Sequence, residues 1–237
     1  MALFVIGDVH LSFSVDKPMR IFDGWDGFEQ RLEKNWRSLV TDTDTVVLPG
    51  DISWGMSLEQ ALADFQFLHS LPGQKLILKG NHDYWWTTRR KMDTFLEENG
   101  LHTLRFVHND AVPVEGKVAV CGTRGWFYDA EADADKKVLL REVGRLETSI
   151  AAAEKTGLEP VVFLHYPPVW GDQVCEPFLE VLQKHGVHRC YYGHVHGRGI
   201  RQAFNGDWNG VRLQLASADS LQFIPLNIPL KIGGING

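Results

Sequence analysis

Residues that can bind divalent metal ions gather in five short clusters, and each cluster follows a run of apolar residues. The clusters offer carboxylate and amide oxygens together with imidazole nitrogens, and they contain no cysteine. The residues concerned are Asp8, His10, Asp51, Asn81, His82, Asp83, His165, His194 and His196. Carboxylate and imidazole ligands without thiolates suit manganese, iron, zinc and similar divalent ions. We therefore expect these clusters to form a metal centre.

The clusters suit a centre of two ions. Asp51 stands alone after its apolar run, so its carboxylate could bridge two ions. Two ions about 3.5–4 Å apart clamp the attacking and leaving oxygens when a phosphoryl group is displaced in line. Water held by such an ion has its pKa lowered to about 7, which supplies hydroxide at neutral pH. The pattern therefore points to phosphoryl chemistry.

Buried strands must bring the clusters together. Continuous β-branched and aromatic runs predict strands over residues 2–6, 45–48, 75–78, 160–164 and 190–192. Ligands of open α/β sheets bind just beyond the carboxyl ends of the strands, so the clusters should converge on one rim. A glycine directly precedes four clusters, and we expect it to permit a sharp turn over the strand end. These glycines are Gly7, Gly50, Gly80 and Gly193.

Helical patterns lie between the strands, and further β structure follows them. Apolar spacing and end signals predict helices over residues 28–39, 57–68, 87–99, 135–156 and 177–184. Hairpin turns are expected at Glu115–Gly116, Asn205–Gly206 and Asn209–Gly210. The order of elements predicts an α/β fold of packed sheets flanked by helices. We expect one domain over 1–237, with a frayed tail at 233–237.

The clusters together resemble the signature of the calcineurin-like metallophosphoesterase superfamily. Each motif is short and weak alone, but all occur in order along the chain. They read Gly7-Asp-Val-His10, Gly50-Asp51, Gly80-Asn-His-Asp83, His165 and Gly193-His-Val-His196. The resemblance implies a sandwich of two packed mixed β-sheets flanked by helices. It also implies a dinuclear metal centre whose metal-bound hydroxide attacks phosphorus in line.

The resemblance also implies a role for each matching residue. One ion would be held by Asp8, His10, Asp51 and His196, and the second by Asp51, Asn81, His165 and His194. His82 would face the scissile group and protonate the leaving oxygen or stabilise charge on the phosphoryl group, with Asp83 orienting it. The cofactors expected are two divalent ions, with manganese first and iron, zinc or nickel as alternatives.

The substrate is expected to be a small organic phosphoester, with a phosphodiester or nucleotide-type compound favoured and a phosphomonoester as the alternative. Aromatic residues near the clusters and one arginine are the candidate contacts, namely Trp54, Trp85, Trp126 and Arg124. Segment 11–28 is a long insertion that could cover the site as a lid. Several phosphoprotein phosphatases of the superfamily carry an arginine soon after the Gly-Asp motif. Asp51-Ile-Ser-Trp54 lacks it, which disfavours that activity.

Each of these residues also has a purely structural interpretation. Asp83 could cap the helix that follows it, Arg124 could be a solvated loop residue, and the aromatic side chains could pack in the core. At the level of function, a non-catalytic scaffold on the same fold and a DNA nuclease are the alternatives. A scaffold is disfavoured because His82 and all the expected ligands are present.

Composition limits the partners further. The 237 residues carry a formal net charge of −6 with an isoelectric point near 5.9, which disfavours the nuclease and stable nucleic-acid binding. Three scattered cysteines suggest a reducing compartment, and no apolar run approaches a membrane span. We therefore expect a cytoplasmic protein, and the sequence leaves its oligomeric state open.

Overall fold

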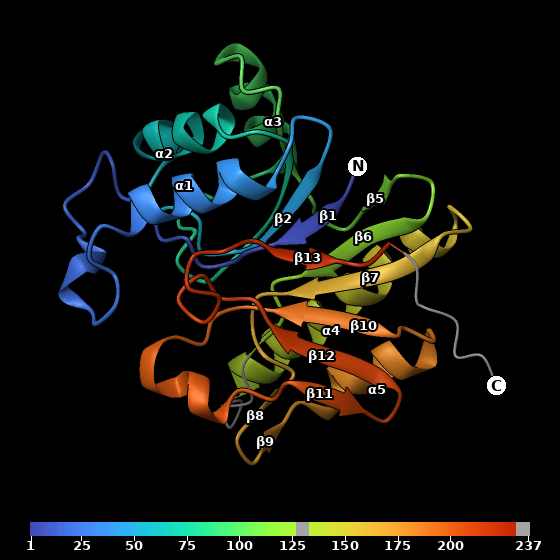
Figure 1. The fold of residues 1–237 in the computed structure, drawn as a ribbon. Helices are drawn as coiled ribbons and strands as arrows, with labels where there is room; N and C mark the ends of the chain where they lie inside the picture. The colour runs from blue at the N-terminus through green and yellow to red at the C-terminus, as the bar shows by residue number, and fades with distance from the viewer. Residues whose placement is uncertain (127–132, 231–237) are drawn as a thin grey trace.

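Two β-sheets lie face to face between two layers of helices in the computed structural model, which describes residues 1–126 and 133–230 (Figure 1). Apolar side chains from both sheets, among them Val5, Val120 and Phe163, form the core between them. Two further cores lie between the sheets and their helices. This architecture confirms the predicted sandwich of two packed mixed sheets. That the whole chain is one domain stays a prediction, and the tail 233–237 lies outside the described residues.

The first sheet has five strands in the order β13-β1-β2-β3-β4. They are β13 (Leu226–Ile228), β1 (Leu3–Val5), β2 (Thr45–Pro49), β3 (Gln74–Leu78) and β4 (Leu104–Phe106). Strands β1 to β4 are parallel, and β13 is antiparallel to β1. Because side chains alternate along a strand, Phe4 packs toward the helices while Leu3 and Val5 pack toward the other sheet. The helices are α1 (Phe28–Leu39), α2 (Leu58–Ser70) and α3 (Arg89–Glu98).

The second sheet has six strands in the order β11-β12-β10-β7-β6-β5. They are β11 (Gly206–Trp208), β12 (Val211–Leu215), β10 (Arg189–Tyr192), β7 (Glu159–Leu164), β6 (Val118–Thr123) and β5 (Ala111–Val114). The four central strands are parallel, and the two edge strands are antiparallel to them. Helices α4 (Asp133–Glu154) and α5 (Glu176–Lys184) pack on its outer face.

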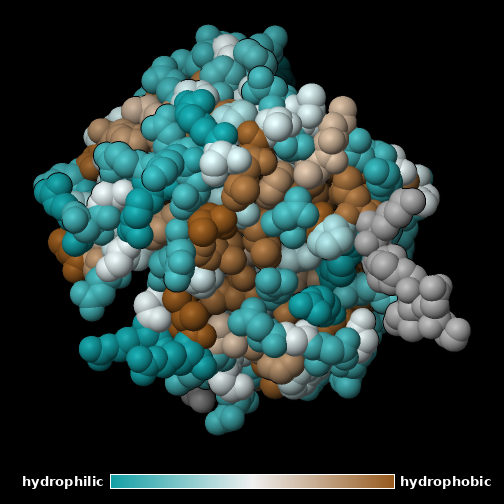
Figure 2. All heavy atoms as spheres, in the orientation of Figure 1, coloured by the Kyte–Doolittle hydropathy of each residue, from teal (hydrophilic) through white to brown (hydrophobic). Residues whose placement is uncertain are grey.

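Smaller elements connect these layers. They are the ribbon β8 (Val169–Trp170) with β9 (Gln173–Val174), and the 3-10 helices η1 (Met19–Ile21) and η2 (Gly197–Gln202). No helix within residues 1–126 and 133–230 combines the length and apolar character needed to cross a membrane. On the face shown in Figure 2, hydrophobic side chains gather near the middle, beside β13.

The two sheets meet at the carboxyl ends of their strands. The backbone N–H of Gly7 donates to the carbonyl of Ala216 at 2.7 Å, and that of Ala218 donates to the carbonyl of Gly7 at 2.9 Å. The chain that leaves β1 therefore pairs with the chain that leaves β12. This junction places polar clusters from both sheets on a common rim.

Most predicted elements are confirmed, and the differences are local. Glu115 and Gly116 turn between β5 and β6 with φ of 56° and 60°, the positive values of a type I′ turn, and the N–H of Lys117 donates to the carbonyl of Val114 at 3.1 Å. The expected turn at Asn205–Gly206 is wrong, because Gly206 already pairs with Leu213 as the first residue of β11. Strand β4 was not expected, because its three residues are defined by pairing with β3 and not by local pattern.

Candidate metal centre

The first group of possible ligands comes from both sheets. Asp8 and His10 follow β1, and His196 follows β10. The Nε2 atoms of His10 and His196 face each other at 3.1 Å, and Nε2 of His196 lies 3.4 Å from Oδ1 of Asp8. Three donor atoms thus converge on one point, as the ligands of a single ion would.

The second group also comes from both sheets, because Asp51 follows β2, His165 follows β7 and His194 follows β10. Nε2 of His165 lies 3.5 Å from Oδ2 of Asp51 and 3.3 Å from Nδ1 of His194. The side-chain oxygen of Asn81 lies 2.6 Å from His165 Nε2 and 2.9 Å from His194 Nδ1. Asn81 therefore belongs to this group, which brings together the four residues expected around the second ion.

Asp51 lies between the two groups. Its Oδ2 atom is 3.7 Å from His10 Nε2 in the first group and 3.5 Å from His165 Nε2 in the second. One carboxylate oxygen thus faces donor atoms of both groups. This geometry suits the bridging role expected for Asp51.

Four of these residues hold an unusual backbone conformation. Asp8, His10, Asp51 and His194 have φ of 58°, 44°, 52° and 71°, in the left-handed region that residues other than glycine seldom adopt. Hydrogen bonds hold them there, such as the one from the N–H of His194 to the carboxylate of Asp8 at 2.9 Å. Such strained conformations cluster at functional sites, where the surrounding structure imposes them.

Only one of the four glycines before the clusters makes the expected turn. Gly50 has φ of 92°, whereas Gly7, Gly80 and Gly193 do not have a positive φ. A Cβ on Gly80 would collide with the backbone nitrogen and carboxylate of Asp51, and one on Gly193 with the carboxylate of Asp8. At these two positions glycine is needed because a ligand side chain passes directly against the backbone.

Asp83 ties the ligand loops together. Its carboxylate accepts hydrogen bonds from the backbone N–H groups of Gly80, Asp51 and Ile52 at 2.7 to 2.9 Å, and from the Trp85 indole at 3.1 Å. It does not cap α3, because the side chain of Thr88 does so. Asp83 therefore binds the backbone on both sides of the loop contact, at Asp51 and at Gly80, and its expected part in orienting His82 stays a prediction.

His82 stands beside the two groups without belonging to either. Its backbone N–H donates to Oδ1 of Asp51 at 2.8 Å, and its ring lies 4.4 Å from the ring of Trp54 and 5.8 Å from that of His10. The hydroxyl of Tyr84 lies 3.4 Å from Nδ1 of His82. Tyr84 is thus a neighbour of the expected catalytic histidine that the sequence did not single out.

The charge state of the second group suits metal binding. Burial lowers the pKa of His165 to about 3 and that of His194 to about 4, so both rings are neutral, the form that binds metals. Burial, followed by the Asp83 and Asp8 carboxylates, raises the pKa of Asp51 well above its usual value. A buried carboxylate crowded by two others is stabilised by cations, so the donor set fits divalent ions.

Asp219 is a further residue of the centre that the sequence did not reveal. Burial opposes protonation of His196, but the carboxylates of Asp8 and Asp219 outweigh it and raise the pKa of His196 to about 10. Asp219 lies 3.0 Å from His196 Nδ1 and accepts from the N–H of Gly197 at 2.8 Å. A carboxylate on the far nitrogen of a ligand histidine fixes its tautomer and orientation. The sequence signal that could have indicated Asp219 is its position soon after β12, at the same rim.

Two of the expected substrate contacts have different surroundings. Trp54 stacks on His10, with ring centres 5.2 Å apart and an interplanar angle of 21°. Trp85 is only 2% exposed and packs against Phe65 and Phe106, which makes it part of the core. The structure therefore brings Trp54 to the metal centre, whereas Trp85 contacts it only through Asp83.

Arg124 and Trp126 lie near the second group of ligands, since the N–H of His165 donates to the carbonyl of Arg124 at 3.0 Å. The guanidinium of Arg124 sits 4.7 Å from the Trp126 ring and pairs with the buried Glu142 at 3.4 Å. Trp126 contacts Tyr166, whose ring lies 4.4 Å from that of His194. This pair therefore approaches the second group of ligands through Tyr166.

Comparison with known proteins adds the family. A family model described as calcineurin-like phosphoesterase matches residues 1–198. A structure from Thermus thermophilus aligns at 10% identity over 97% of this chain and 98% of its own, with a TM-score of 0.57. A protein of unknown function from Aquifex aeolicus aligns at 15% identity over 95% of both chains, with a TM-score of 0.54. At these identities the two structures support the fold alone. No curated protein has a sequence that matches.

Proposed function

This chain belongs to the calcineurin-like phosphoesterase family, and from this we propose that it hydrolyses a small organic phosphoester at a centre of two divalent ions. The observation that carries the proposal is the pair of ligand groups with Oδ2 of Asp51 between them. His82 beside this pair supplies a further group for the reaction.

The proposed ligands follow the two groups. Asp8, His10 and His196 would hold one ion, Asn81, His165 and His194 the other, and Asp51 both. When bound, two such ions lower the pKa of water and neutralise charge on the phosphoryl group. Manganese is our first choice of metal, because oxygen and imidazole donors without thiolate suit it, and iron, zinc and nickel are the alternatives.

The chain's own residues would orient the substrate and handle the proton. With Nδ1 of His82 beside the Tyr84 hydroxyl, Nε2 is the atom proposed to donate to the leaving oxygen. Hydrolysis forms a bond from the water oxygen to phosphorus, breaks the bond to the leaving oxygen and delivers a proton to that oxygen. Asp83 would hold Asp51 in place through the backbone, as a positioning residue.

A phosphodiester or nucleotide-type substrate is the favoured class, because aromatic rings lie against a ligand of each group, Trp54 against His10 and Tyr166 against His194. A phosphomonoester is the alternative within the same chemistry. The three cysteines are buried and free, which fits the reducing compartment of the cytoplasm that we propose as the location.

Hydrolysis of chromogenic esters tests the proposal. The protein loaded with manganese should cleave bis(p-nitrophenyl) phosphate or p-nitrophenyl phosphate. His82→Ala should lower kcat by about 10²–10⁴-fold, because an acid or hydrogen-bond donor to the leaving oxygen is removed. Metal analysis should still find two ions per chain in this variant. His188→Ala removes an exposed histidine and serves as the matched control.

Two results would contradict the proposal. Protein that holds two ions but cleaves neither these esters nor nucleotides or phospholipids would not be a phosphoesterase. Protein that binds almost no metal in the presence of manganese would favour a non-catalytic scaffold on the same fold.

A further inference from the structure

A cavity of about 450 Å³ opens beside the first group of ligands. His10, His82 and His196 line it, so it borders both the metal centre and the proposed proton donor. Its volume falls in the range of about 300–1,000 Å³ that is typical of sites for small organic molecules. Since His82 would face the leaving oxygen, the group attached to that oxygen has room in this cavity.

Aromatic and apolar side chains form the walls. Trp54 contributes from the loop after β2, and Met19, Phe22 and Trp25 contribute from segment 11–28. The Trp54 ring lies 4.4 Å from the His82 ring, and Trp25 meets His10 edge-on at 5.9 Å. Flat walls of this kind suit a flat aromatic group, which gains from stacked and edge-to-face contacts as well as from burial.

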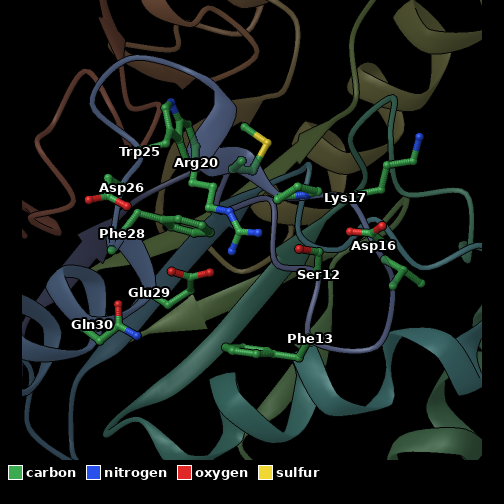
Figure 3. A pocket seen from close by; sticks show the side chains of 14 residues that line it. Ser12, Phe13, Asp16, Lys17, Arg20, Trp25, Asp26, Phe28, Glu29 and Gln30 are labelled. Carbon is green, nitrogen blue, oxygen red and sulfur yellow. The ribbon is translucent and has the colours of Figure 1, made fainter.

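Segment 11–28 also borders a second cavity, of about 460 Å³, which is lined by apolar side chains and by charged ones (Figure 3). These include Asp16, Lys17, Arg20, Asp26 and Glu29. Phe22 lines the cavity at the metal centre and is 54% exposed. Leaving a phenylalanine half exposed costs hydrophobic free energy, which an apolar ligand would recover.

The segment is attached firmly enough to serve as a wall. Trp25 is 2% exposed and packs edge-on against Phe28 and Phe223 at 5.0 and 5.1 Å. The N–H of Phe13 donates to the buried carboxylate of Asp64 on α2 at 2.8 Å. Asp64 also accepts a hydrogen bond from the hydroxyl of Ser53, which precedes Trp54. The Asp64 side chain therefore links segment 11–28 to the loop that carries Trp54.

Two charged residues complete the lining. Asp23 from segment 11–28 and Arg198 from η2 are both exposed and both border the cavity. They offer a hydrogen-bond acceptor and a donor to the polar edge of a heteroaromatic ring.

We propose that this cavity binds the leaving group of the substrate and that this group is a flat aromatic ring, with segment 11–28 as its specificity-determining wall. The inference rests on the proposed function and adds the class and the location of the group. It assigns the ring to the side of the centre with Trp54 and Phe22, and not to the side with Arg124 and Trp126.

Binding of two phosphonates that cannot be hydrolysed tests the inference. Phenylphosphonate and methylphosphonate share the metal-binding group and differ in the ring. By calorimetry on the manganese-loaded protein, phenylphosphonate should bind about tenfold more tightly or better. Trp54→Leu and Phe22→Ser should each reduce this ratio toward one by weakening the binding of phenylphosphonate.

The variants and the possible outcomes distinguish failure of the inference from failure of the proposed function. Phe22 is exposed, so Phe22→Ser should fold even if Trp54→Leu does not, and Trp208→Leu on β11 is the matched control. Equal affinity for the two phosphonates, or a preference for phenylphosphonate that both variants retain, would overturn the inference while ester hydrolysis stands. If neither phosphonate binds and no ester is cleaved, the proposed function falls and the inference with it.

Discussion

At the amino end of the five-stranded sheet, the chain buries two charged side chains and satisfies both. The Asp44 carboxylate accepts from the N–H groups of Ala2 and Thr41 at 2.6 and 2.8 Å. The Lys75 ammonium donates to the carbonyls of Leu71 and Gly73 at 2.6 and 2.7 Å. Burial by itself would raise the pKa of Asp44, but its hydrogen bonds outweigh burial and lower it.

The carboxyl end of the same sheet buries three carboxylates next to one another. Asp8, Asp51 and Asp83 are at most 1% exposed and lie close together. Burial raises the pKa of Asp83 to about 6, although its backbone hydrogen bonds oppose the rise. Burial of charge therefore does not distinguish a site from a structural feature. What differs is the balance at the carboxylates: hydrogen bonds lower the pKa of Asp44, whereas the pKa values of Asp51 and Asp83 stay raised, which suits a place where cations bind.

Among variants that test the difference between the two ends of the sheet, Gly80→Ala at the carboxyl end is expected to have the largest effect on metal content and turnover. The new Cβ would displace Asp51, whose Oδ2 atom faces both ligand groups. We expect loss of both ions and a fall in kcat of about 10²-fold or more, because small displacements in a catalytic site are that costly. Metal analysis after dialysis and ester hydrolysis measure the two effects.

Gly144→Ala is the matched control, because a Cβ there meets open space on α4. It should retain both ions and gain about 0.5–1 kcal/mol of stability from better helix propensity. Thermal unfolding of both variants with a chelator present separates loss of ions from loss of the fold. A Gly80→Ala protein with two ions and full turnover would show that close approach at Gly80 is unimportant.

A smaller effect on the same end is expected from Asp219→Asn. The amide keeps the shape of the side chain but no longer offers a charge to Nδ1 of His196. Loss of such a partner weakens metal binding by about 10–100-fold, here for one ion of the two. Calorimetric titration with manganese should resolve one weakened and one unchanged site.

Asp207→Asn, at the turn between β11 and β12, is the control for Asp219→Asn. It should leave both sites unchanged. Equal weakening of both sites by Asp219→Asn would mean that the two ligand groups respond as one unit.

The smallest effect on the centre is expected from Asp44→Asn at the amino end, which should leave metal content and turnover unchanged. It should lower the free energy of unfolding by about 1–3 kcal/mol, because buried donors lose a charged acceptor. Since the pKa of Asp44 is lowered in the folded chain, its contribution is complete above about pH 4 and is lost as the pH falls through the folded value.

Urea unfolding at pH 7 and at pH 3 tests this pH dependence. The difference between wild type and Asp44→Asn should be larger at pH 7. Loss of bound metal in Asp44→Asn would contradict the proposed difference between the two ends of the sheet.

The sequence predicted the fold well because strand formation depends on patterns of neighbouring residues. Runs such as 45–48 and 160–164 consist of β-branched and apolar residues, and such runs form buried strands in packed sheets. Strand β4 could not be found in this way, because three residues carry too little pattern. The role of Gly80 could not be found either, since the colliding atoms belong to Asp51, on a different strand end.

The sequence by itself indicated the residues of the two ligand groups, because they follow strands closely and parallel strands end on one rim. Only the tertiary structure decided that Asp219 supports His196, that Trp85 lies in the core, and that Trp54 and Phe22 line a cavity. The physical reason is that strand and helix formation depends on neighbouring residues. Contacts across the rim depend instead on how two sheets and a long loop pack, which short-range pattern does not encode.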